Sequence, residues 1–280
     1  MKGPCRPYAP ALGLMGIITL TTDFSVADTF VAQMKGAIMS CVRDTTIVDV
    51  THEIPKFDVV AGALAMREAA PSFPDGTVHV GVVDPGVGSE RARVIVAARY
   101  EYRPGEVKRA FFVGPDNGLL SLAAPPESRT GCWVIDELER FGLAGGSSTF
   151  EGRDIFAPVA ALLSEGSAPS RFGAAKADLI ELDLPRSHEV LPGKIEGQIV
   201  SFDSFGNATT NIPASVASAG SLEIGTATLP WHRTFADVGA RDGLCYVNSR
   251  GFIEAAMNCG DLKSELGLRI GTPVVLTKAS

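Results

Sequence analysis

Three stretches of this sequence end an apolar run on a carboxylate or an amide. They read TTDF, VVDPGVGSER and VGPDNGLL, and they place Asp23, Asp84 and Asn117 where a strand would stop. Each stretch alone is typical of an ordinary turn, because turns use Asp, Asn, Gly and Pro. In open parallel sheets, however, ligands bind beyond the carboxyl ends of the strands. Three such loops at one edge therefore favour a ligand site, with these three residues as candidates.

The second of these loops brings an acid and a guanidinium within reach of each other. The DPGVG turn allows Arg91 to fold back and form a bidentate pair with Asp84. The alternative is a purely structural ion pair, which stabilises little if it is exposed. The loop is not a phosphate-binding signature, because GVGSER lacks the last glycine of G-x-G-x-x-G and no P-loop occurs. No G-x-S-x-G elbow occurs either, so a serine esterase has no support.

The stretch STFEGRDIFAP crowds three charges between an aromatic residue and an apolar, helix-like run. The charges are Glu151, Arg153 and Asp154, and the run covers residues 155–163. Burying charges is costly unless they are paired or used. One interpretation is that Glu151 forms an ion pair with Arg153. The other is that Glu151 works in a site.

Two further clusters lie in the last third of the chain. SFDSFGNATTNI combines a carboxylate, an aromatic face and two amides in Asp203, Phe205, Asn207 and Asn211. Such a set can recognise a purine, although a polar loop with one aromatic anchor would look the same. The later NSRGFIEAAMN contains a serine and an arginine that could hold a carboxylate. These are Ser249 and Arg250, and the segment by itself would be a surface hairpin.

The elements expected around these loops indicate two domains. Apolar strands alternate with helix-like runs over residues 15–184, which predicts an α/β domain with a mainly parallel sheet and helices on both faces. Asp28 and Asp58 are expected to cap its first two helices. After LPRSHEVLPGK come short strands separated by turns, which predict a smaller antiparallel β-barrel domain over residues 194–280. Residues 1–14 are expected to form a disordered leader.

Composition limits the partners. A length of 280 residues suits two domains, and a net charge of -7 argues against nucleic acid while leaving a cationic small molecule open. Five scattered cysteines without a C-x-x-C pair favour a reducing, cytoplasmic setting. Four histidines far apart in sequence give a metal site little support. No apolar run reaches the roughly 18 residues of a membrane span.

Taken together and in this order, the motifs resemble one family, the S-adenosylmethionine hydroxide adenosyltransferases, relatives of the fluorinase and the chlorinase. The matching segments extend from about Met15 to the end of the chain. The resemblance implies an α/β domain, a smaller β-barrel domain and a homotrimer with sites between subunits. It implies that water replaces methionine at the 5′ carbon of S-adenosylmethionine and that adenosine is formed. No cofactor is implied, since S-adenosylmethionine is the substrate.

The resemblance also implies residue roles. Asp23 would bind the ribose hydroxyls, and Phe205 and Asn207 would hold the adenine. Asp203 and Ser249 would contact the amine and the carboxylate of the methionine part, with Arg250 nearby, and Asn117 joins the substrate-binding candidates. The DPGVGSER loop favours water over halide as the nucleophile. One departure is TTDFS, where the family usually has glycine at the position of Ser25, which should tolerate serine unless it needs a positive φ.

A second departure concerns the expected catalytic residues. Hydrolytic members use an Asp-Arg-His set to handle water, and Asp84 and Arg91 match its first two members. Glu151 stands where the family has histidine, in TFEGRDIFAP. We expect Glu151 either to orient water and act as the base, with one carboxylate beside Arg91 raised in proton affinity, or to weaken hydrolysis. If Glu151 weakens hydrolysis, the protein would be a slow or inactive binder of S-adenosylmethionine or adenosine. A halogenase-like enzyme and a nucleoside-binding regulatory protein are further alternatives.

Overall fold

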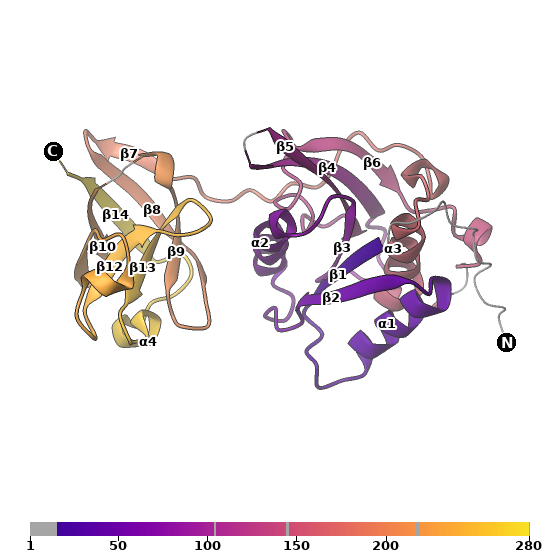
Figure 1. Ribbon diagram of the computed structural model, residues 1–280, viewed down its shortest axis with the longest axis horizontal. Coiled ribbons are helices and arrows are strands. Elements are labelled where there is room, and N and C mark those ends of the chain that lie inside the picture. Colours follow the sequence, from indigo (N-terminus) through magenta and orange to yellow (C-terminus); the bar gives the residue numbers. More distant parts are fainter. Residues whose placement is uncertain (1–15, 104, 144–145, 217–218, 280) are drawn as a thin grey trace. The chain divides into compact units, whose positions relative to one another are not determined.

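The computed structural model of the protein describes residues 16–103, 105–143, 146–216 and 219–279 (Figure 1). The chain divides into two compact units between Leu182 and Asp183. The leader expected over residues 1–14 lies outside the described residues. Within the described ranges, no helix has the length and the apolar character needed to cross a membrane.

Among the described residues, the first unit is built on a six-stranded mixed sheet in the order β2-β1-β3-β5-β4-β6. The strands are β1 (Gly16–Thr22), β2 (Thr45–Thr51), β3 (Thr77–Val82), β4 (Arg93–Arg103), β5 (Glu106–Pro115) and β6 (Arg129–Val134). The neighbours among β2, β1, β3 and β5 pair in parallel, whereas β4 is antiparallel to both β5 and β6. The parallel pairings of β2, β1, β3 and β5 agree with the expected mainly parallel sheet, and β4 is the strand that runs against its neighbours. Its connection to β5 is too short for the crossover that a parallel pair needs.

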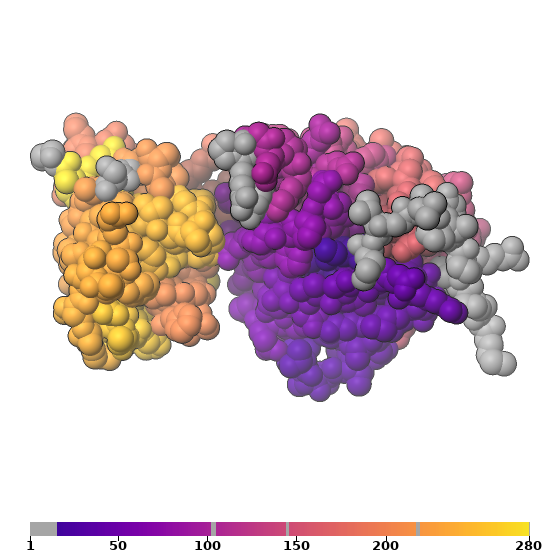
Figure 2. Space-filling view, viewed as in Figure 1, coloured from indigo at the N-terminus to yellow at the C-terminus, as the bar shows by residue number. Residues whose placement is uncertain are grey.

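Two apolar cores cover this sheet. Helices α1 (Phe30–Cys41) and α3 (Ala157–Ser164) contribute to one core, and α2 (Val59–Ala69) contributes to the other. Alternate residues of a strand serve opposite faces, so Ile95 belongs to the first core and its neighbour Val94 to the second. On the visible face of the first unit, Figure 2 shows a small dark indigo area between purple and magenta segments. Residues 18–22 of β1 are buried, as expected for a strand covered on both faces.

Only one of the two expected helix caps forms. Asp58 accepts a hydrogen bond from the backbone N–H of Ala61 at 2.9 Å and caps α2. The expectation for Asp28 is wrong, because Thr29 occupies the capping position of α1. Asp28 instead lines a cavity of the first unit.

The second unit is an antiparallel sheet, eight-stranded within its described part, with main order β11-β10-β14-β8-β9-β13-β12 and β7 beside β8. Its strands are β7 (His188–Leu191), β8 (Lys194–Phe202), β9 (Ala208–Pro213), β10 (Gly220–Ile224), β11 (Ala227–Pro230), β12 (Gly243–Val247), β13 (Phe252–Met257) and β14 (Pro273–Lys278), with one short helix, α4 (Leu262–Leu266). A bridge from Trp231 to Cys245 brings the two ends of the order together. The sheet is thus nearly closed and barrel-like, and its core includes Ile199, Leu222 and Leu276.

The loop after β1 holds Ser25 in a strained conformation. Its φ of 58° lies in the left-handed region, which answers the condition set by the sequence: this position does need a positive φ. The backbone N–H of Ser25 donates to the carbonyl of His52 at 2.7 Å, and this bond holds the loop in place. The strained residue is therefore two positions after Asp23, one of the candidate site residues.

We expect Ser25→Gly to raise the free energy of unfolding by about 0.5–1 kcal/mol. Relief of a left-handed residue is worth roughly 1–2 kcal/mol, and the greater freedom of glycine in the unfolded chain offsets roughly 0.5–1 kcal/mol of it. Urea denaturation measures the change. Ser25→Ala is the control, since it keeps the strain and should give no gain. A glycine variant less stable than the alanine variant would contradict the assignment.

Candidate active site

The first unit contains a cavity of about 330 Å³ beyond the carboxyl ends of β1 and β3. Asp23 follows β1, Asp84 lies just after β3, and Glu151 precedes a π-helical turn over Gly152–Phe156. Asp23 and Asp84, two of the three strand-end candidates, line the cavity together with Glu151. Single π-helical turns are frequent at functional sites.

Asp84 and Arg91 form the bidentate pair that the loop sequence predicts. Arg91 Nε donates to Asp84 Oδ1 at 2.9 Å, and Arg91 Nη2 donates to Oδ2. Both side chains are more than nine-tenths buried, so the pair is not the weak surface ion pair of the alternative. Gly88 allows the loop to take this path. Its φ is 80°, and a Cβ there would lie 2.8 Å from the carbonyl oxygen of Ser148.

Glu151 joins the same cluster through two guanidinium groups. Its Oε2 accepts from Arg91 Nη2 at 2.5 Å, and its Oε1 accepts from Arg93 Nε at 2.8 Å and Nη2 at 2.5 Å. Only 2% of the residue is exposed. Asp84, Arg91, Glu151 and Arg93 therefore form a chain of alternating charge, which we call the acid–guanidinium quartet.

The quartet overturns two interpretations of Glu151. The expected ion pair with Arg153 does not form, because Arg153 donates to Asp154 and to Gln33 instead. The proposed rise in proton affinity does not apply to Glu151 either. Burial by itself would raise the pKa of Glu151, but hydrogen bonds from Arg93 and Arg91 outweigh it and hold the pKa below its ordinary value. Glu151 is thus an ionised acceptor.

One buried donor of the quartet remains unused. Arg91 Nη1 has no hydrogen-bond partner among the described residues, although it is shielded from solvent. An unsatisfied buried N–H group costs free energy that a bound ligand or water can recover.

Aromatic side chains that the sequence reasoning missed form one wall of the cavity. Phe24, Phe30 and Phe150 contact one another with ring centroids 5.2–5.8 Å apart. Phe57 also lines the cavity with 67% of its surface exposed, and its backbone N–H donates to Asp23 Oδ2 at 2.9 Å. The phenylalanines next to Asp23 and Glu151 in sequence were the available signal.

Asn117 is placed differently from the other candidates. It is not among the residues that line this cavity. Its Nδ2 donates to the carbonyl of Val83 at 2.9 Å, and its Oδ1 accepts from the backbone N–H of Leu119 at 3.1 Å. Both ends of the amide therefore hold backbone, and Val83 directly precedes Asp84. The structure gives Asn117 a part in shaping the loop that contains Asp84.

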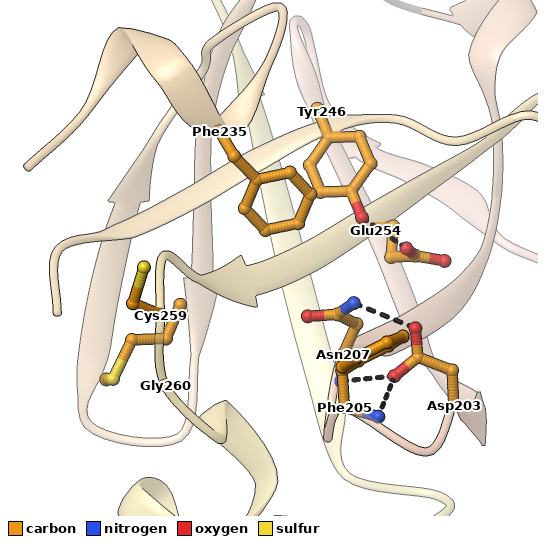
Figure 3. A pocket seen from close by; sticks show the side chains of 9 residues that line it. Asp203, Phe205, Asn207, Phe235, Tyr246, Glu254, Cys259 and Gly260 are labelled. Atoms are coloured by element: carbon orange, nitrogen blue, oxygen red, sulfur yellow. Dashed lines mark hydrogen bonds between the residues drawn. The ribbon is translucent and has the colours of Figure 1, made fainter. Parts of the chain in front are cut away.

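The second unit has its own cavity of about 640 Å³, and three of the predicted residues line it (Figure 3). Asp203 organises the loop: Oδ1 accepts from the backbone N–H groups of Phe205 and Asn207, and Oδ2 accepts from Asn207 Nδ2 at 2.8 Å. Phe205 is 74% exposed, which leaves its ring available for stacking. The rings of Phe235 and Tyr246 lie beside each other at another side of the cavity.

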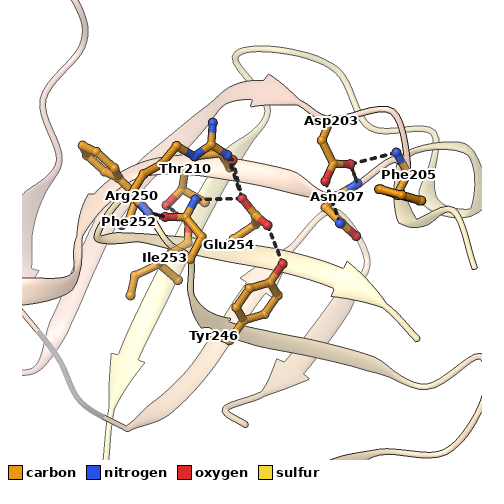
Figure 4. Close-up of polar contacts among 11 residues, drawn as sticks. Asp203, Phe205, Asn207, Thr210, Tyr246, Arg250, Phe252, Ile253 and Glu254 are labelled. Atoms are coloured by element: carbon orange, nitrogen blue, oxygen red, sulfur yellow. Dashed lines mark hydrogen bonds and ion pairs between the residues drawn. The ribbon is translucent and has the colours of Figure 1, made fainter. Parts of the chain in front are cut away.

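A buried carboxylate that the sequence reasoning missed lies at the centre of this unit's polar contacts (Figure 4). Glu254 Oε2 accepts from Thr209 at 2.6 Å, Asn248 at 2.7 Å and Arg250 at 3.0 Å, and Oε1 accepts from the Tyr246 hydroxyl. Burial would raise the pKa of Glu254, but these bonds hold it below the ordinary value. The available signal was a single acid inside the apolar strand FIEAAM.

The predicted pair Ser249 and Arg250 is split between two environments. Arg250 is part of the contacts around Glu254, and its Nη2 also donates to the Thr209 hydroxyl at 2.6 Å. Ser249 is exposed at the turn between β12 and β13.

The described residues include no group of three or more His, Cys, Asp or Glu side chains arranged to hold a metal ion.

Comparisons with known proteins agree with both units. Residues 18–173 match the model of the SAM hydroxide adenosyltransferase N-terminal domain, and residues 197–275 match that of the C-terminal domain. The (R)-S-adenosyl-L-methionine hydrolase of Thermus thermophilus is 34% identical over 91% of this chain and 97% of its own length. A fluorinase from Actinopolyspora mzabensis is more distant, with 27% identity over 94% of this chain and 97% of the fluorinase. The crystal structure of an uncharacterized conserved protein from Thermotoga maritima superposes with a TM-score of 0.83 at 29% identity, covering 95% of this chain and all of the other.

Proposed function

Because the chain belongs to the SAM hydroxide adenosyltransferase family, we propose that it hydrolyses S-adenosylmethionine by substitution at the 5′ carbon, releasing adenosine and methionine. The observation that carries the proposal is the acid–guanidinium quartet at the wall of a cavity that also contains Asp23. A pure nucleoside binder has no need of two buried acids locked onto one arginine.

The chemistry needs a water molecule in line with the carbon–sulfur bond. Water attacks the 5′ carbon as methionine leaves with the bonding electrons of its sulfur, so the positive charge of the sulfonium moves to the attacking oxygen. Binding the cation equally in both states would gain no rate. The gain comes from positioning the water and from accepting hydrogen bonds from it as its charge grows.

Asp84 is our candidate for the group that receives the proton. Arg91 cannot act as a base, because a guanidinium stays protonated. Glu151 has a lowered pKa and is committed to two arginines. Attack by neutral water leaves a protonated hydroxyl, which is a strong acid, so even a weakly basic carboxylate can take its proton. Asp84 lines the cavity, where the attacking water would bind.

The binding roles remain part of the proposal. Asp23 Oδ1 would accept from the ribose hydroxyls while Oδ2 holds the backbone N–H of Phe57. Phe205 would stack on adenine, with Asn207 at its edge. Asp203, Ser249 and Arg250 would bind the amine and carboxylate of the methionine part. A homotrimeric assembly, carried by the family resemblance, and a cytoplasmic location, carried by the scattered cysteines, also stay proposals.

Glu151 favours a specific second candidate, a slow enzyme that mainly binds S-adenosylmethionine. An ionised glutamate held by Arg93 and Arg91 has little affinity for a proton. Loss of a general base typically costs about 10²–10⁴-fold in rate. The quartet nevertheless keeps Asp84 and Arg91 in place, which is why we rank the hydrolase first.

Incubation with S-adenosylmethionine in H₂¹⁸O tests the proposal. We expect adenosine with ¹⁸O at the 5′ hydroxyl, unlabelled methionine, and no 5′-halo-adenosine when chloride or fluoride is added. Glu151→Gln should lower the rate at least about tenfold, because it weakens the charge-assisted bonds to Arg91. Calorimetry measures the binding of S-adenosylmethionine separately from its turnover. Tight binding without adenosine above the protein-free control would support the binder, and a halogenated product would support the halogenase.

A further inference from the structure

Arg93 is the member of the acid–guanidinium quartet to which neither the sequence motifs nor the proposed mechanism assigns a part. It is the first residue of β4. Its guanidinium donates two hydrogen bonds to Glu151 Oε1, at 2.8 and 2.5 Å. Its side chain is 31% exposed, against 7% for Arg91 and 2% for Glu151. Arg93 is thus the solvent-side end of a chain that runs inward to Asp84.

The charges explain why this arginine matters. Asp84 and Glu151 share the single guanidinium of Arg91, and these three groups alone would carry one net negative charge in a buried setting. Like charges disfavour ionisation of a carboxylate and raise its proton affinity. Arg93 adds the second positive charge, so the quartet is neutral. Both oxygens of Glu151 then receive charged donors, and the carboxylate orientation is fixed.

We propose that Arg93 is a positioning residue that keeps Glu151 ionised and turned onto Arg91, so that Glu151 serves as a fixed anchor for the guanidinium that holds Asp84. The expected effect on the reaction rate rests on the proposed hydrolysis. The effect of Arg93 on the charge and orientation of Glu151 does not. Protonation of Glu151 would remove the charge that anchors Arg91 Nη2 and free the guanidinium to shift relative to Asp84. Activity should therefore fall as Glu151 takes up a proton.

The test compares the wild type with Arg93→Met, Arg93→Lys and a matched surface control, Arg109→Met. Arg109 also pairs with a carboxylate, Asp75, but its side chain is 66% exposed. We expect Arg93→Met to lower kcat/KM at pH 7 roughly tenfold, the worth of about one charge-assisted hydrogen bond. The acid limb of its pH profile should move to higher pH, because Glu151 loses one of its two cations. Arg93→Lys should restore part of both effects, and Arg109→Met should change neither.

A double-variant cycle separates this role from a general loss of folding. If Arg93 acts through Glu151, Arg93→Met should add little to Glu151→Gln. Glu151→His should be slower with Arg93 present than with Arg93→Met, because the imidazole cannot neutralise that guanidinium. Additive effects, or a His variant indifferent to Arg93, would overturn the proposal.

A readout that needs no turnover keeps the inference separate from the proposed function. Proteins labelled with ¹³C at the glutamate carboxyl groups are titrated by NMR, and the Glu151 signal is assigned by its loss in Glu151→Gln. We expect the pKa of Glu151 to be higher in Arg93→Met than in the wild type. A chain that releases no adenosine but shows this change refutes hydrolysis and supports the role of Arg93. An unchanged titration refutes the role, whatever the activity.

Discussion

Arg91→Leu is expected to reduce adenosine release by about 10²–10⁴-fold, because Asp84, the proposed proton acceptor, then loses the guanidinium that positions it. Arg91 is the member of the quartet that contacts both acids, through Nε and Nη2 to Asp84 and through Nη2 to Glu151. Without it, two buried carboxylates face each other with Arg93 as their nearest partner in the quartet. Breaking a buried ion pair on one side typically costs about 3–5 kcal/mol. The variant should therefore also unfold at a distinctly lower urea concentration.

The measurement pairs single-turnover assays with urea denaturation, so that lost folding is not taken for lost chemistry. Arg109→Leu removes a guanidinium of the same size from an exposed pair with Asp75 and should change neither quantity by a measurable amount. Arg91→Lys keeps the charge but cannot bind both acids in the same fork geometry, so it should recover stability better than rate. Full activity in Arg91→Leu would remove the quartet from the mechanism.

The position of Glu151 could be read from the sequence, but its chemical state could not. TFEGRDIFAP marks the residue, and local proximity suggests Arg153 as its partner. The actual partners, Arg91 and Arg93, are 60 and 58 residues away in the chain. Tertiary structure brings Glu151, just before the π-helical turn, to Arg93 at the start of β4 and to Arg91 in the loop before it. A sequence argument that counts the charge of Arg91 alone therefore gives the wrong sign for the change in proton affinity.

Two inferences from local chemistry are confirmed, although the equally local cap expected at Asp28 does not form. Asp58 caps its helix, and the DPGVG turn returns Arg91 to Asp84. The exceptions depend on tertiary context. Asn117 has the residue type of a ligand-binding side chain, yet both ends of its amide hold backbone. Strand β4 looks like its parallel neighbours in composition, but its short connection to β5 makes the pair antiparallel.

Glu254 shows a different limit of sequence reasoning. A lone acid in an apolar strand is a weak signal, because it reports burial without reporting what surrounds it. The structure places it against four donors from Thr209, Tyr246, Asn248 and Arg250. The cavity that would take the nucleoside is lined partly by this acid and by Tyr246. Stability and binding in the second unit are therefore expected to depend on the same side chain.

Glu254→Gln is expected to lower the free energy of unfolding by about 1–3 kcal/mol at neutral pH. The amide has nearly the shape of the carboxylate, but it replaces one acceptor by a donor among groups that mostly donate, so at least one buried donor loses its partner. Glu254→Ala should cost about 3–5 kcal/mol, since it breaks the partly buried ion pair of Arg250 with Glu254. Weaker binding of S-adenosylmethionine, measured by calorimetry, should accompany both changes.

The pH dependence supplies the decisive control for this prediction. The pKa of Glu254 is lower in the folded protein than the ordinary value of 4.5. Its stabilisation is therefore fully present above that ordinary value, and it is lost as the pH falls through the folded pKa. The difference in unfolding free energy between the wild type and Glu254→Gln should be constant near neutral pH and shrink below about pH 4.5. Urea denaturation across this range measures it. A difference that stays unchanged in acid would mean that the charge of Glu254 contributes nothing and that only its shape matters.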